Sequence, residues 1–155
     1  MAAAGAFAGA LLMGRRGAWS VRPAAAVVLV SGWLATSLIL LSPYVFSPER
    51  RQMESVPFAG YIGPQPERTV SHAVELTLAF FPVGFALAFL ARGGRRWMMI
   101  GAVALVSGGT LEYLQGWIVG RYPDVTDVGM LLMGALAGAW AASPLLPDRP
   151  STLAL

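Results

Sequence analysis

The sequence contains no cysteine among its 155 residues, which excludes disulfide bonds, cysteine-ligated metals and thiol nucleophiles. It also lacks lysine, because all 11 of its basic residues are arginine. Only 12% of the residues are charged, whereas soluble domains have about a quarter. Hydrophobic residues make up 56% of the chain, and the mean hydropathy is +0.62. This shortage of charge predicts an integral membrane protein.

The formal net charge is +3, and in a soluble protein such a balance would suggest nucleic acid. Here the arginines lie at the ends of apolar runs, where they act as signals for membrane topology. We therefore expect no nucleic-acid partner. The single histidine gives little support to a metal site, and we expect neither a metal nor a cofactor.

Four apolar stretches are long enough to cross a bilayer, for which a helix needs about 20 residues. They predict an all-α bundle of four transmembrane helices, at about residues 24–46, 70–90, 97–117 and 127–146. The spans belong to a single membrane domain over residues 21–146. Residues 1–20 are expected to form a tail that is either interfacial or disordered, and residues 147–155 a second tail.

The arginines also predict the orientation of the bundle, because positive charge is retained on the cytoplasmic side. This rule places both termini in the cytoplasm, together with Arg15, Arg16, Arg22, Arg92, Arg95, Arg96 and Arg149. The outer face then carries Arg50, Arg51, Arg68 and Arg121. In this topology the start of the second span, the end of the third and the start of the fourth share one level at the outer face.

That level collects seven polar side chains, and we predict that they form a binding site: His72, Glu75, Glu112, Gln115, Arg121, Asp124 and Asp127. Glu112 and Gln115 are three residues apart, so they project from one face of a helix. Glu112 would lie one turn inside the membrane, where a carboxylate is costly and a purely structural role explains it least. Arg121 is expected to pair with Glu112 through two parallel hydrogen bonds.

The other members of this group have a structural interpretation as well. Asp124 stands where it would cap the fourth helix, and Asp127 lies in the first turn, where the helix dipole favours negative charge. His72 and Glu75 are three residues apart at the entry of the second span. Two interpretations therefore remain open: helix initiation and interfacial polarity, or a site for a polar headgroup with a general acid and base.

Two elements of the sequence resemble the signature of VanZ-like membrane proteins. The first is Glu112-Tyr-Leu-Gln115, then Arg121-Tyr-Pro-Asp124-Val-Thr-Asp127, then Gly134 and Gly138. The second is Phe80-Phe-Pro82-Val-Gly84, which is similar to a Phe-x-Pro-x-Gly element of the middle span. The sequence departs from the family at Leu131 and Leu76, where asparagine is usual. Any contact that those asparagines make in the family is lost or relocated here.

The resemblance implies a multi-pass protein of the bacterial cytoplasmic membrane. The family is named for a protein associated with resistance to the glycopeptide teicoplanin. We expect a protein that binds a polar or lipid-linked ligand of the cell envelope, and a binding protein is favoured over an enzyme. One alternative is a membrane-surface hydrolase or transferase using Glu112 or Asp124 with Arg121. The other is a scaffold for a partner membrane protein, with Gly134 and Gly138 at the interface.

Overall fold

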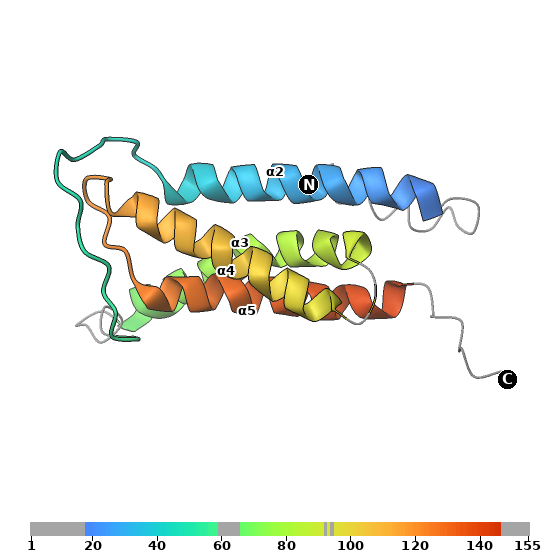
Figure 1. Cartoon of the computed structure of the whole chain (residues 1–155). Coiled ribbons are helices and arrows are strands. Elements are labelled where there is room, and N and C mark those ends of the chain that lie inside the picture. Colours follow the sequence, from blue (N-terminus) through green and yellow to red (C-terminus); the bar gives the residue numbers. More distant parts are fainter. Residues whose placement is uncertain (1–17, 59–65, 92, 94, 147–155) are drawn as a thin grey trace, which may run out of the picture.

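The structure is a computed structural model that describes residues 18–58, 66–91, 93 and 95–146. The described chain is a bundle of helices without a β-sheet, as the sequence predicted (Figure 1). In chain order these are α2 (Ala18–Leu40), α3 (Pro66–Leu90), α4 (Arg96–Gln115) and α5 (Val125–Ala142), followed by the 3₁₀ turn η2 (Ser143–Leu145).

The prediction of four membrane-spanning helices is confirmed. Each helix contains a segment long and apolar enough to cross a bilayer: Val21–Leu40, Val70–Leu90, Arg96–Gln115 and Val125–Leu145. Large apolar side chains such as Val30, Val106 and Trp140 are exposed on the outside of the bundle, at 56%, 69% and 74%. Such a surface fits a lipid environment, because water would penalise this much exposed apolar area.

Both ends of α2 differ from the predicted first span. The first span was expected to continue to Phe46, but α2 ends at Leu40, because Pro43 has no backbone N–H with which to continue the helix. Beyond it Phe46 forms an antiparallel bridge with Ile118. Residues 18–20 of the expected N-terminal tail belong to α2. The rest of that tail and the C-terminal tail at 147–155 lie outside the described residues.

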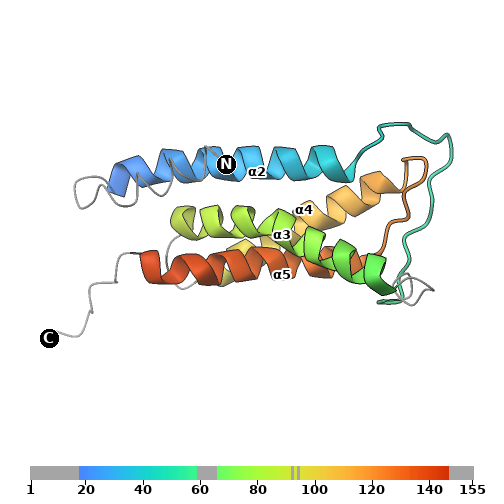
Figure 2. The same cartoon turned by 180° about the vertical axis from the view of Figure 1, so that it is seen from behind.

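Successive helices run in opposite directions, so the ends of α2 and α4 meet the starts of α3 and α5 at one end of the bundle (Figures 1 and 2). We call this the polar end. Within the bundle α3 contacts both α2 and α5, and α4 packs mainly on α5. The arrangement brings the predicted site residues of α3, α4 and α5 to the same end.

Glycines allow α3 and α5 to lie in backbone contact. A Cβ atom added to Gly134 would overlap the Thr77 carbonyl group, and one added to Gly138 would overlap the Phe81 carbonyl oxygen. Gly84 of α3 approaches α5 in the same way. Gly134 and Gly138 therefore pack inside the chain, as small residues do in membrane helix pairs. The idea that these two glycines receive a partner helix is wrong, since α3 already covers them.

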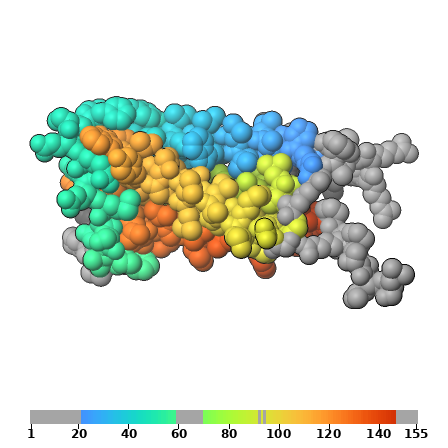
Figure 3. Space-filling view, in the orientation of Figure 1, coloured from blue at the N-terminus to red at the C-terminus, as the bar shows by residue number. Residues whose placement is uncertain are grey.

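Two loop segments close the polar end and are joined by backbone hydrogen bonds. The Ser47 N–H donates to the Trp117 carbonyl at 2.8 Å, the Arg51 N–H donates to Gly116 at 2.8 Å, and the Glu54 N–H donates to Pro123 at 2.9 Å. We call residues 44–58 and 116–124 together the cap. Figure 3 shows the first of these segments wrapped over this end of the bundle, next to the end of α4. The cap fixes the chain after α2 against the junction between α4 and α5.

Candidate functional site

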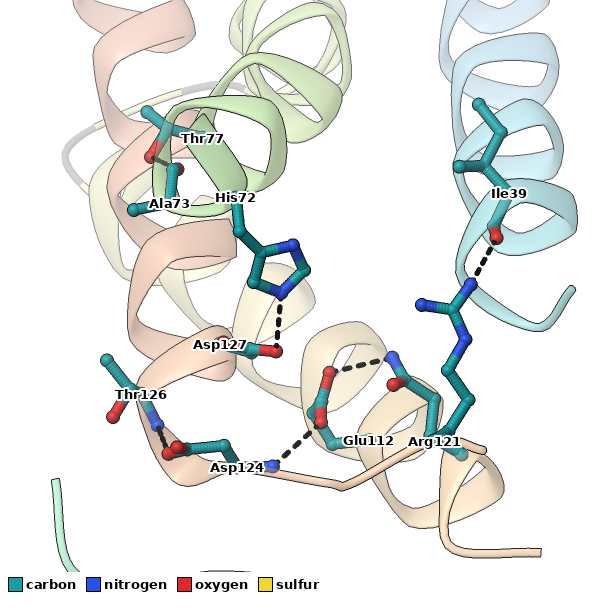
Figure 4. Close-up of polar contacts among 10 residues, drawn as sticks. Ile39, His72, Ala73, Thr77, Glu112, Arg121, Asp124, Thr126 and Asp127 are labelled. Atoms are coloured by element: carbon teal, nitrogen blue, oxygen red, sulfur yellow. Dashed lines mark hydrogen bonds and ion pairs between the residues drawn. The ribbon is translucent and has the colours of Figure 1, made fainter. Parts of the chain in front are cut away.

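Glu112 is the centre of a buried hydrogen-bond network in the last turn of α4 (Figure 4). Its side chain is fully buried, with an exposure of 0%. One carboxylate oxygen accepts a hydrogen bond from the Gln115 side-chain amide at 2.9 Å, and the two residues share one face of α4, as their spacing predicted. The other oxygen accepts from the Asp124 backbone N–H at 3.1 Å. Glu112 thus connects the end of α4 to the start of α5.

Asp124 caps α5, as the sequence predicted. Its backbone is extended, and its carboxylate accepts a hydrogen bond from the Thr126 N–H at 2.7 Å. This bond satisfies one of the donors that a helix leaves unpaired in its first turn. The Thr126 hydroxyl accepts in turn from the backbone N–H of Phe58, at 2.7 Å. This bond attaches the loop segment 44–58 to the start of α5.

Replacing Asp124 separates its capping role from a role of its charge. We expect Asp124→Ala to lower the free energy of unfolding by about 1 kcal/mol, because the Thr126 N–H loses its acceptor. Asp124→Asn should lower it by less, because an asparagine side chain caps about as well as aspartate. Thermal unfolding of the purified variants in detergent measures both changes. A large loss in Asp124→Asn would contradict a purely capping role.

Asp127 lies in the first turn of α5, as predicted, and pairs with His72 of α3. The histidine Nε2 lies 3.2 Å from a carboxylate oxygen of Asp127. The two side chains differ in access to the surface, since His72 is 42% exposed and Asp127 only 7%. Asp127, Asp124 and His72 are all electrostatic neighbours of Glu112. The structure therefore brings three carboxylates and one histidine together from three helices.

Arg121 does not pair with Glu112, and that prediction is wrong. Its guanidinium donates from Nε to the Ser42 carbonyl at 2.8 Å and from Nη2 to the Ile39 carbonyl at 3.1 Å (Figure 4). The physical reason is that carbonyl groups at a helix end and just beyond it have no further helical turn to bond to, and the Ile39 and Ser42 carbonyls lie at and just beyond the end of α2. Arg121 satisfies two carbonyl groups there, so it holds the end of α2 to the cap.

Glu75 is the other predicted residue that stays outside the network. It is exposed on α3, and no hydrogen bond links it to the network among the residues that the structure describes. It remains an electrostatic neighbour of His72, one helical turn away. Leu76 and Leu131, where the family usually has asparagine, are 1% and 0% exposed in the apolar core. Those two positions make no polar contact in this chain.

Thr126 and Phe58 are the network members that sequence reasoning missed. Thr126 stands two residues after the capping aspartate, which is a recognisable turn pattern, but its link to a segment 68 residues away is a tertiary contact. No buried side-chain nitrogen or oxygen in the described ranges lacks a hydrogen-bond partner. In the same ranges no three histidine, aspartate or glutamate side chains are grouped as a metal site would require.

A family comparison agrees with this geometry. The sequence matches the profile of the VanZ/LLP1 family over residues 25–146, which include most of the first span, the other three spans and every residue of the network. The chain belongs to the VanZ/LLP1 family. No curated protein and no solved structure matches the chain. Membership in VanZ/LLP1 thus confirms the resemblance to VanZ-like proteins seen in the sequence.

Proposed function

We propose that this VanZ/LLP1 protein binds a polar headgroup of a lipid-linked cell-envelope ligand at the polar end of its bundle, which faces the outside of the bacterial cytoplasmic membrane. The observation that carries the proposal is the His72–Asp127 pair. It joins the second turn of α3 to the first turn of α5, and its histidine is 42% exposed near the end of the apolar spans. A ligand held in the membrane surface would meet this pair first.

The charge around the pair supports a ligand rich in hydroxyl or amino groups. Asp127 lies beside His72, and the buried Glu112 stands behind both as an electrostatic neighbour. An ionised carboxylate accepts hydrogen bonds and cannot donate them, so these carboxylates favour ligand groups that donate, such as sugar hydroxyls or ammonium groups. Polar groups at membrane depth are costly, and a function is the usual reason for retaining them.

An enzyme using Glu112 or Asp124 as base and Arg121 as anion holder finds no support in these contacts. Both oxygens of Glu112 are occupied, and Asp124 is occupied in capping α5. Arg121 is directed at the end of α2. A base must reach the proton that it removes, and a carboxylate with both oxygens engaged inside the protein is badly placed for that. We therefore favour binding without turnover, with a link to glycopeptide resistance or envelope maintenance.

The test is binding of a polyprenyl-linked disaccharide precursor of the cell wall to the protein in nanodiscs. We expect His72→Ala and Asp127→Asn each to weaken binding by roughly tenfold, as loss of a charge-assisted hydrogen bond does. Glu49→Gln is the matched control, because Glu49 is exposed on the cap away from the network. Unchanged binding by folded His72→Ala and Asp127→Asn variants would refute the site. Equal displacement by the polyprenyl phosphate alone would assign binding to the phosphate and refute headgroup recognition.

A further inference from the structure

Two arginines of the cap are held on tyrosines at the polar end. The guanidinium of Arg50 lies 4.4 Å from the ring centre of Tyr113, in the last turn of α4. The guanidinium of Arg51 lies 4.2 Å from the ring centre of Tyr122. Stacking of this kind attracts the cation to the face of the ring and restricts where it can move. Each arginine is therefore presented in a defined position without the help of a carboxylate.

Neither arginine is neutralised within the part of the chain that the structure describes. The ion pair found there joins His72 and Asp127, and it involves neither Arg50 nor Arg51. Arg51 donates one hydrogen bond, from Nη1 to the Arg121 carbonyl at 3.2 Å. A guanidinium carries five N–H donors, so most of the donors on both side chains have no acceptor among the described residues. Both arginines are exposed and can receive an anion.

The surroundings of the two arginines fit a membrane surface. Tyr113 and Tyr122 are 49% and 75% exposed, and tyrosine is enriched at the level of the lipid headgroups. Val45 and Val119, joined by a backbone hydrogen bond of 2.8 Å, are 54% and 47% exposed on the same cap. Positive charge beside exposed apolar and aromatic side chains matches a molecule with an anionic head and an apolar tail.

We propose that Arg50 and Arg51, stacked on Tyr113 and Tyr122, bind the phosphate groups of anionic membrane lipids at the polar end. This lipid site is separate from the His72–Asp127 pair and does not depend on the function proposed for that pair. The lipid phosphates accept hydrogen bonds from the guanidinium edges, while the tyrosine rings hold the guanidinium planes. Bound lipid would fasten the cap to the membrane surface and set the depth of the polar end.

Native mass spectrometry of the protein in neutral detergent tests this lipid site. The protein is titrated with dioleoyl phosphatidylglycerol and, for comparison, with zwitterionic dioleoyl phosphatidylcholine. We expect preferential binding of phosphatidylglycerol, and we expect Arg50→Gln with Arg51→Gln to weaken it roughly 25-fold, since each arginine near an anionic surface contributes about a factor of five. Phosphatidylcholine binding should change little.

Two further variants make the result decisive. Arg95→Gln with Arg96→Gln removes an adjacent pair from the opposite end, where Arg96 lies 5.2 Å from the Trp97 ring centre, and should weaken binding much less. Tyr113→Leu with Tyr122→Leu keeps every charge but removes both stacks, and should also weaken phosphatidylglycerol binding. Equal losses from the two arginine pairs would overturn the proposal, because they would indicate general electrostatic attraction. Displacement of the lipid by excess glycerol phosphate would overturn it as well, by indicating a site for free phosphate.

Discussion

Replacing Gly134 by alanine should destabilise the bundle by about 3 kcal/mol, the upper part of the range for overpacking a closely packed interior. The added methyl group would meet the Thr77 carbonyl oxygen and its neighbouring backbone atoms, which cannot rotate away as a side chain could. The helices α3 and α5 would have to separate along their closest contact. Gly138→Ala should behave alike, because its Cβ would meet the Phe81 carbonyl.

Gly129→Ala is the matched control in the same helix. No atom lies within 4 Å of the position that its Cβ would take, so the substitution has space. In a helix, alanine is more favourable than glycine by up to about 1 kcal/mol, and Gly129→Ala should therefore be neutral or stabilising. Unfolding in detergent mixtures, followed by circular dichroism, measures all three variants. If Gly134→Ala is as stable as Gly129→Ala, the close contact of α3 with α5 is not an energetic determinant of the fold.

Replacing Glu112 should produce the second large effect. In Glu112→Gln the new side chain offers one acceptor oxygen where Glu112 offers two, so either one buried donor loses its acceptor or the Gln115 amide must turn over to present its oxygen to the new N–H2 group. A buried donor without a partner costs about 1–3 kcal/mol. Glu112→Leu removes both acceptors, and we expect it to lower the free energy of unfolding by about twice as much as Glu112→Gln.

Glu75→Gln is the control for Glu112, because it changes an exposed carboxyl group of α3. Exposed substitutions of this kind usually stay within about 0.5 kcal/mol. The same unfolding measurement applies, together with the ligand titration proposed for His72 and Asp127. If Glu112→Gln unfolds like the unsubstituted protein yet loses ligand binding, then Glu112 contacts the ligand directly and the structural role assigned to it is wrong.

The sequence predicted part of the environment of Glu112, because burying a carboxylate inside a membrane span is costly. Its position one turn inside an apolar span correctly indicated that it must have polar partners. The nearest cation in the sequence appeared to be the natural partner, yet the acceptors of Glu112 are used by an amide and a backbone N–H. Arg121 instead donates hydrogen bonds to the Ser42 and Ile39 carbonyls at the end of α2, and no local pattern in the sequence predicts these contacts.

The sequence by itself determined the features that depend on composition and on neighbours along the chain. The lengths of the apolar segments predicted the four spans. The positions of Asp124 and Asp127 predicted the start of α5, because capping and the helix dipole act within one turn. Tertiary structure alone decided which distant groups meet. Direct contact between backbones placed Gly134 and Gly138 against α3, and helix packing paired His72 with Asp127 across 55 residues. Such contacts follow from the packing of whole helices, and no spacing within one helix specifies them.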